Sequence, residues 1–232
     1  MADFYTVKVE SNRALTPEMR LITLSGGPAD LYARYTVPGQ YLQVAIGEGK
    51  PGFFAIASAP GERRFELLIK RSPGLAEELH AIRPGGEVRV SAPAGKGYVI
   101  ADHEGKDLLL LAQGSGLAPI RAVIKSLVGG PQLGKVRLFV GIRTLQDLAF
   151  SEESKSWAAD GVEIVHCLSG SPAEASGGPG HHHGYIQHVL KTLGGTGRPT
   201  VVCLCGNKDM MAECRAVLAE HGVEADAVLT NF

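Results

Sequence analysis

The chain has 232 residues, of which 44% are hydrophobic, so it can bury one large core or two modest ones. Its net charge is near −1, with 23 lysines and arginines against 24 aspartates and glutamates, and this balance provides no single-sign field for nucleic acid or an anionic membrane. The longest apolar runs have the length of a strand, so we expect a soluble protein with no nucleic-acid partner and no membrane insertion.

The first ninety residues alternate short β-rich runs with turn residues. The pattern predicts strands over 4–10, 20–25, 41–46, 53–58, 65–70 and 87–90, and a short helix over 75–81. Glycine- and proline-rich breaks separate these runs. Six short strands with one helix favour a closed antiparallel barrel.

After the glycine-rich stretch at 93–97 the pattern changes to strands that alternate with helices. Predicted strands lie at 108–112, 136–141, 162–167 and 200–204, and predicted helices at 117–128, 152–159, 185–193 and 208–220. This alternation is typical of a parallel sheet with right-handed crossovers. We therefore predict a barrel domain over residues 1–100 and an α/β domain over 101–232, with a ligand-binding loop at 169–183.

The most informative stretch joins the strand 108–112 to a glycine-rich turn and a helix start. Gly114 and Gly116 allow the backbone to turn tightly and to approach an anion, and Pro119 suits the first turn of a helix. The free N–H groups at this helix start would point at a pyrophosphate. Gly114, Ser115 and Gly116 are therefore predicted to bind a dinucleotide, and a tight turn without a ligand is the alternative.

The order of the motifs resembles the ferredoxin–NADP reductase superfamily. The turn has proline where the dinucleotide fingerprint has its third glycine, and Cys205-Gly206-Asn207-Lys208-Asp209-Met210 follows much later. In that family a flavin-binding barrel precedes a pyridine-nucleotide domain. The resemblance implies an oxidoreductase that takes hydride from NAD(P)H onto FAD and passes electrons to an unidentified acceptor, for which a protein is one candidate. Its flavin strand is most similar to that of the plant ferredoxin–NADP reductase-like, fruit-protein-like flavoproteins.

That strand departs from the family pattern. Where the family has Arg-x-Tyr-Ser and then Ile-Ala-Ser, this chain has Gly52-Phe53-Phe54-Ala55-Ile56-Ala57-Ser58. The resemblance places five of these residues along FAD: Phe54, Ala55, Ile56, Ala57 and Ser58. Phe54 keeps an aromatic face for stacking, but Gly52 lacks the family's cation and Ala55 lacks its hydroxyl. A plain barrel strand is the alternative interpretation.

A second run, Ile69-Lys70-Arg71-Ser72-Pro73-Gly74-Leu75-Ala76, leads from a strand into the short helix. Backbone N–H groups of Gly74, Leu75 and Ala76 are predicted to hold the FAD pyrophosphate. Ile69 is placed in the same site. Lys70 or Arg71 is predicted to replace the missing arginine, and a solvated cationic strand end is the alternative for both. Phe232 is predicted to cover the other face of the flavin.

On the nucleotide side, the resemblance places Cys205 beside the nicotinamide as the catalytic residue and lets Gly206 make room for the dinucleotide. Cys167 and Cys203 are predicted to be core residues. NADP-specific members of the family place serine and arginine after the third strand of this domain, where this chain reads Leu168-Ser169-Gly170-Ser171. We therefore predict a preference for NADH, with Arg143 as the cation able to hold the 2′-phosphate of NADPH.

Other functional classes are weaker. His181-His182-His183 is interpreted as a polar loop and not as a metal site, because three adjacent residues cannot all face one ion from a regular element. The glycine turn lacks the spacing of a hydrolase elbow, and the four cysteines show no iron–sulfur pattern or disulfide framework. The rival hypothesis is a binding or regulatory protein that keeps the reductase fold, and binds flavin or nucleotide, without turnover. The expected compartment is the cytoplasm, or a plastid if a transit peptide has been removed.

Overall fold

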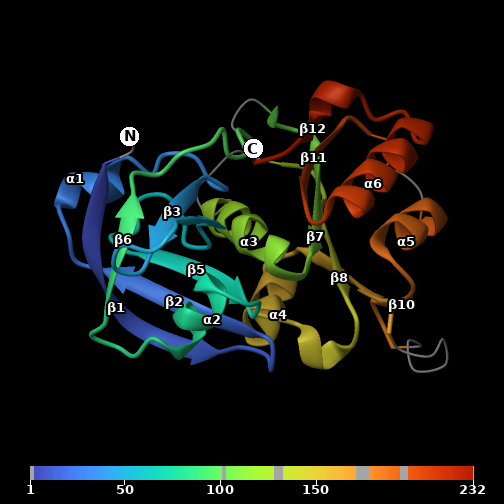
Figure 1. Cartoon of the computed structure of the whole chain (residues 1–232). Coiled ribbons are helices and arrows are strands. Elements are labelled where there is room, and N and C mark those ends of the chain that lie inside the picture. Colours follow the sequence, from blue (N-terminus) through green and yellow to red (C-terminus); the bar gives the residue numbers. More distant parts are fainter. Residues whose placement is uncertain (1–2, 101–102, 128–132, 171–177, 194–197, 232) are drawn as a thin grey trace.

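The computed structural model describes residues 3–100, 103–127, 133–170, 178–193 and 198–231. Two six-stranded sheets lie next to each other, an antiparallel one from the first half of the chain and a parallel one from the second half. Figure 1 shows helix α3 between them. Both predicted sheet types are confirmed, whereas the domain boundary near residue 100 stays a prediction.

The antiparallel sheet is a nearly closed barrel with the strand order β4-β3-β6-β1-β2-β5. Its strands are β1 (Phe4–Ala14), β2 (Met19–Ser25), β3 (Tyr41–Ala45), β4 (Gly52–Ala55), β5 (Phe65–Lys70) and β6 (Glu87–Ser91), with helices α1 (Ala29–Ala33) and α2 (Leu75–Ala81). The two edges meet where Ile56, just after β4, forms a bridge with Leu67 of β5. Ala57 N–H also donates to the Glu66 carbonyl at 2.7 Å.

The parallel sheet has the order β10-β9-β8-β7-β11-β12. Its strands are β7 (Asp107–Gln113), β8 (Val136–Ile142), β9 (Glu163–Leu168), β10 (His181–His183), β11 (Thr200–Cys205) and β12 (Val228–Leu229). Its helices are α3 (Leu117–Ser126), α4 (Ser151–Ala159), α5 (Ile186–Leu193) and α6 (Lys208–Glu220). From β7 the chain adds β8, β9 and β10 in turn on one side, and then returns through α5 to place β11 on the other side of β7. The order of the strands therefore reverses between β7 and β11, and their carboxyl ends form the switch point of the sheet.

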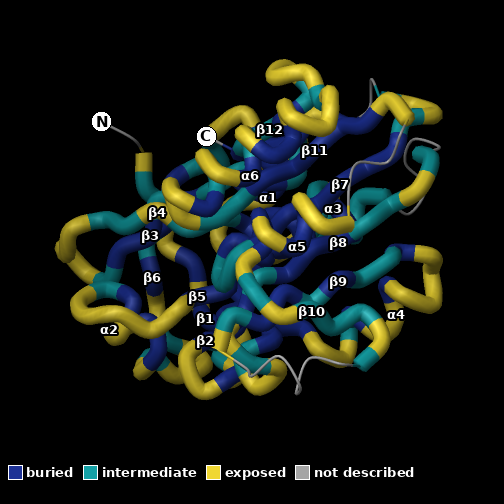
Figure 2. The backbone as a smooth tube through the Cα atoms, turned by 90° about the vertical axis from the view of Figure 1, so that its right-hand side faces the viewer, coloured by how far each residue is buried: buried dark blue, intermediate teal, exposed yellow. Residues whose placement is uncertain are grey.

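The strand β7 explains how the two halves pack. Leu108 and Leu110 point to the face that is covered by α3 and α4, and Leu109 and Leu111 point to the face that is covered by α5 and α6. The first face also packs against Met19 of the barrel, so one hydrophobic cluster spans both sheets. Figure 2 shows the central parallel strands as a buried, dark blue band edged by exposed turns.

Among the described residues, two strands and one α-helix were not predicted from the sequence. The run His181–His183 is not a loop: it is the short edge strand β10, which pairs in parallel with β9 from His181 opposite His166 to His183 opposite Leu168. The helix α1 and the two-residue strand β12 were also missed. Each has five residues or fewer, so tertiary pairing and packing decide it more than local sequence does. Residues 171–177 of the predicted loop lie outside the described residues.

Every helix in the described part of the chain is too short or too polar to cross a membrane.

Candidate functional site

A cavity of about 1070 Å³ lies at the carboxyl ends of β7, β8, β9 and β11 and reaches the barrel. Its barrel wall consists of Glu18, Met19, Phe53, Phe54, Ala55, Leu68 and Lys70. Its α/β wall includes Gly114, Ser115, Gly116, Arg143, Cys205 and Gly206. The fold therefore brings nine of the predicted site residues onto one cavity, at the edge where open parallel sheets bind ligands.

The turn after β7 uses its two glycines for different reasons. Gly114 has a φ of +56°, which favours glycine, and the space around its Cβ position is open. Gly116 has an ordinary helical φ of −61°, but a Cβ there would lie 2.5 Å from the carbonyl oxygen of Cys205. No side chain caps this helix start, so its first N–H groups can bind an anion.

The end of β11 is bonded directly to this turn. Asn207 N–H donates to Gln113 Oε1 at 3.1 Å, and Asn207 Oδ1 caps α6 by accepting from Met210 N–H at 2.8 Å. Both residues line the cavity and neither was predicted as a site residue. The position of Asn207 before a helix was a readable capping signal, whereas the partner of Gln113 lies 94 residues away and was not readable.

Cys205 is partly exposed and lines the cavity, and burial raises the pKa of its thiol to about 11, although a hydrogen bond with Tyr98 opposes the shift. The thiol is therefore neutral at pH 7. Tyr98 is fully buried, and its hydroxyl donates to the Leu204 carbonyl at 3.0 Å. Cys167 and Cys203 are fully buried, which confirms their predicted core position, although Cys167 also forms part of the cavity surface.

The pairing of β3 with β4 decides which aromatic ring is exposed. Phe54 lies opposite Leu42, which is fully buried in the barrel core, whereas Phe53 lies opposite Gln43 on the outer face. Phe54 is accordingly half-buried and packs on the barrel core, although it still touches the cavity. Phe53 is 62% exposed, and the ring of Tyr41 supports it edge-on at a centroid distance of 5.5 Å. The exposed ring on the barrel side of the cavity is thus Phe53, and stacking of a flavin on the half-buried Phe54 stays a prediction.

Four predicted flavin contacts have their side chains in the core, away from the cavity wall: Ile56, Ala57, Ser58 and Ile69 are each fully buried. Ser58 Oγ is occupied by the Arg64 carbonyl and the Glu66 N–H. Contacts between the backbone of these four residues and a flavin stay a prediction.

The second predicted flavin motif, residues 69–76, also has only part of its residues on the cavity wall. Lys70 is exposed on the cavity wall, whereas Arg71 is exposed outside it. Gly74, with a φ of +87°, precedes α2, Leu75 is partly buried, and Ala76 is buried. None of these three lines the cavity, but a Cβ at Gly52 would lie 3.0 Å from Leu75 Cδ2, so the start of α2 adjoins β4.

The far end of the cavity has mixed charge. Arg143 is exposed there, and Asp147 lies on the same wall with one carboxylate oxygen bound to the N–H and hydroxyl of Thr144. Tyr185 is 52% exposed and also lines the cavity, as does Gln187, whose amide donates to Glu213 at 2.8 Å. Sequence reasoning placed Tyr185 and Gln187 only at a helix start and missed their place on this wall.

Phe232 lies outside the described residues. Its neighbour Asn231 is buried, donates from its side-chain amide to the Gly39 carbonyl at 3.2 Å, and touches the cavity. The chain is therefore held against the barrel one residue before Phe232.

Comparison with known proteins agrees with this architecture. Residues 110–216 match the family model described as the oxidoreductase NAD-binding domain. Over 229 residues the chain is 30% identical to a fruit protein of Actinidia deliciosa, covering 91% of this chain and 70% of the relative. The chain belongs to the ferredoxin–NADP reductase superfamily. As a member of that superfamily it is an oxidoreductase with an NAD-binding domain.

Other superfamily members extend the likeness to the full length. The chain is 27% identical to ferredoxin–NADP reductase B of Sorangium cellulosum, covering 92% of this chain and 91% of the relative. A crystal structure of a ferredoxin NADP⁺ reductase from Neisseria gonorrhoeae with bound FAD and NADP superposes with a TM-score of 0.82 at 18% identity, covering 100% of both chains. At that identity the superposition shows a shared fold.

Proposed function

We propose that this superfamily member is an NAD(P)H-dependent flavoprotein reductase. The glycine turn of the α/β half would hold NAD(P)H and the barrel wall would hold FAD, so that electrons from the nucleotide could reach an acceptor protein through the bound flavin. The observation that carries this proposal is the cavity with two walls of different chemistry. One wall has an uncapped helix start and two close glycine turns, and the other has an exposed aromatic ring and a lysine.

The α/β wall fits a pyridine dinucleotide. The open space at Gly114 lets a phosphate approach the backbone, and the helix dipole of α3 favours its negative charge. The exposed ring of Tyr185 offers a flat surface to the adenine base. Cys205 and Gly206 lie at the adjacent strand end and would border the nicotinamide.

The barrel wall fits a flavin in part. Phe53 provides an exposed ring for stacking, with Phe54 at its side, and Lys70 provides a cation for the pyrophosphate. Bound FAD would supply a centre that accepts hydride and releases electrons singly. Gly52 provides no cation, and Ala55 provides no hydroxyl on the outer face that it shares with Phe53. The residues present therefore support flavin binding that is weaker than with the family's own motif.

The names of two relatives support a protein acceptor. One is the reductase component of the naphthalene 1,2-dioxygenase system of Pseudomonas putida, called a ferredoxin–NAD(P)⁺ reductase, and the other is the sulfhydrogenase 1 subunit gamma of Pyrococcus furiosus. Both names describe parts of larger redox systems. We infer a small ferredoxin-type protein as the acceptor of this chain.

The decisive experiment is an absorbance spectrum of the purified protein, with and without added FAD, before and after NADH or NADPH is added without oxygen. We expect flavin absorbance that is bleached by the nucleotide. If added FAD does not bind, or binds and is not bleached by either nucleotide, the reductase proposal is wrong and a non-catalytic nucleotide-binding role replaces it.

Changing Cys205 to serine should slow flavin reduction and leave nucleotide affinity nearly unchanged. Serine is close to cysteine in size, so only the sulfur beside the nicotinamide is lost. Because the pKa of Cys205 is about 11, the rate should show no step from this group between about pH 6 and about pH 9. Stopped-flow reduction with saturating nucleotide measures the rate. The control is Cys203→Ser in the core of the same strand, which should lower stability and not the rate.

NADH should be the preferred nucleotide. The Asp147 carboxylate on the cavity wall repels a 2′-phosphate, and Arg143 is the exposed cation on that wall able to offset the repulsion. Changing Arg143 to alanine should therefore weaken NADPH about tenfold or more and leave NADH unchanged. Dissociation constants for both nucleotides decide the matter. A wild type that prefers NADPH, with a preference that survives Arg143→Ala, would contradict both statements.

A further inference from the structure

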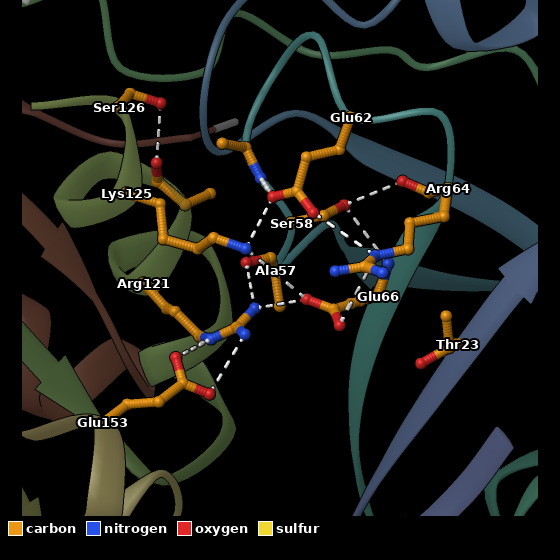
Figure 3. A network of polar contacts seen from close by, with 12 residues as sticks. Thr23, Ala57, Ser58, Glu62, Arg64, Glu66, Arg121, Lys125, Ser126 and Glu153 are labelled. Carbon is orange, nitrogen blue, oxygen red and sulfur yellow. Dashed lines mark hydrogen bonds and ion pairs between the residues drawn. The ribbon is translucent and has the colours of Figure 1, made fainter. Parts of the chain in front are cut away.

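The side chain of Arg121 lies between the two halves of the molecule. It is not part of the cavity that contains the glycine turn and Cys205. It projects from α3, five residues after Gly116, and is only 5% exposed. Figure 3 shows its guanidinium at the centre of a polar network that includes Glu66 of the barrel and Glu153 of α4. A buried cation between two domains needs partners on every side.

Each part of the guanidinium has a partner. Nη1 donates to Glu66 Oε2 at 2.6 Å and to the Ala57 carbonyl at 2.8 Å, both in the barrel. Nε and Nη2 donate to the two carboxylate oxygens of Glu153 at 2.6 and 3.1 Å. The cation also stacks on the ring of Phe150, with Cζ 4.6 Å from the ring centroid.

The guanidinium of Arg121 keeps its positive charge although it is buried. Burial lowers the pKa of Arg121, but hydrogen bonds to Glu153 and Glu66 and the charges of both carboxylates outweigh burial, so the net pKa is raised. Lysine has no comparable fork of donors, because its ammonium is a single point of charge. A lysine at this position therefore keeps the charge and loses the simultaneous bonds to Ala57 and Glu153.

The barrel partners of Arg121 belong to the segment that carries the flavin wall. Ala57 follows Ala55 by two residues, and its N–H closes the barrel by donating to the Glu66 carbonyl. On the other side, α3 is continuous with the Gly114–Gly116 turn. One guanidinium thus bonds the end of the flavin strand to the helix that starts at the nucleotide turn.

We propose that Arg121 is a positioning residue that fixes the separation and angle between the flavin wall and the nucleotide wall. The inference rests on the proposed reductase function, because hydride transfer requires the donor carbon of the nicotinamide and the acceptor nitrogen of the flavin to be nearly in contact. A displacement of about 1 Å in such a geometry costs up to about 100-fold in rate. Arg121 does not line the cavity and would act only through Ala57 and α3.

A matched control lies one helical turn away. Lys125 of α3 forms an ion pair with Glu62 of the barrel at 2.6 Å and a longer one, at 3.9 Å, with the Glu66 oxygen that Arg121 binds, but its side chain is 28% exposed. Lys125→Gln therefore removes a charged contact across the same boundary from the same helix. Both side chains of this pair are partly open to solvent, so water can replace the contact and it should not fix the geometry.

The first test compares Arg121→Lys, Arg121→Gln and Lys125→Gln by stopped-flow reduction and by titration with FAD and NADH. We expect both Arg121 variants to lower the rate of hydride transfer by about 10- to 100-fold, with dissociation constants unchanged, and Lys125→Gln to change neither. A wild-type rate in Arg121→Lys, or an equal loss in Lys125→Gln, would overturn the proposal. A loss confined to the dissociation constants would also overturn it.

The second test needs no cofactor. Spin labels on cysteines introduced at the exposed positions Glu87 of β6 and Lys191 of α5 report the distance between the two halves, with the protein lacking these cysteines as the labelling control. Arg121→Lys should shift or broaden the distance distribution, and Lys125→Gln should leave it as in the wild type. An unchanged distribution would overturn the positioning role, whereas failure of the wild type to reduce flavin would overturn only the proposed reductase function.

Discussion

Gly116→Ala is expected to lower the free energy of unfolding by about 1–3 kcal/mol and to weaken NADH binding about tenfold to a hundredfold. Residue 116 has an ordinary helical backbone, so alanine brings no conformational strain. The cost is steric, because the new Cβ would lie 2.5 Å from the Cys205 carbonyl oxygen and 2.9 Å from its carbon. These are backbone atoms, so the two turns that form the nucleotide wall must separate. Chemical denaturation and nucleotide titration measure the two effects.

Gly222→Ala provides the control for this prediction. Gly222 follows α6, far along the chain from the cavity residues of β7, and has a φ of +77° with no atom within 4 Å of its Cβ position. Alanine there should cost about 1–2 kcal/mol through backbone strain and leave nucleotide affinity intact. If Gly116→Ala loses stability but binds NADH as the wild type does, the contact with Cys205 does not shape the nucleotide wall.

Restoring the family's flavin residues, as Gly52→Arg with Ala55→Ser, should tighten FAD binding about tenfold to a hundredfold and speed its reduction. The arginine adds a charged hydrogen bond to phosphate, worth about 1.5–3 kcal/mol. The serine adds a hydroxyl on the outer face beside Phe53, where it can polarise the reacting centre. FAD dissociation constants and stopped-flow rates of the wild type and the double variant measure both effects.

The two single variants separate these contributions. Ala55→Ser fits the outer face and should change the reduction rate with little loss of stability. Gly52→Arg must displace two flexible side-chain ends, because its Cβ would lie 3.0 Å from Leu75 Cδ2 and 3.1 Å from Phe54 Cε2. We expect it to tighten FAD and to lower the melting temperature slightly. Tight FAD and fast reduction in the wild type, unaffected by the double change, would show that Lys70 already compensates.

Local patterns predicted most of the fold. The leucine run of β7 and the glycine turn after it are specified by residues within ten positions of one another, and the structure has both where the pattern put them. The two-sided burial of β7 also follows from its continuous apolar sequence. The strand β10 was missed because three histidines carry no strand pattern and only pairing with β9 holds them extended.

Contacts between distant parts of the chain decide which side chains face the site, and local sequence patterns did not predict this. Phe53 and Phe54 are adjacent and chemically identical, so only the register against Leu42 and Gln43 reveals which ring is exposed. The partners of Arg121 are 32 to 64 residues away, and no spacing rule joins them. A motif fixes which residues gather near a ligand, but the face that each one presents depends on strands from elsewhere in the chain.

The hydrophobic cluster that unites Met19, Leu21 and Leu68 of the barrel with β7 limits how this protein can be recombined with its relatives. A barrel separated from its partner would present that apolar surface to water, which favours aggregation. A chimera that takes one half from another reductase must therefore replace both surfaces of the seam together. For this chain, exchanging a domain therefore depends first on matching the apolar surfaces of the seam and only then on the linker between the halves.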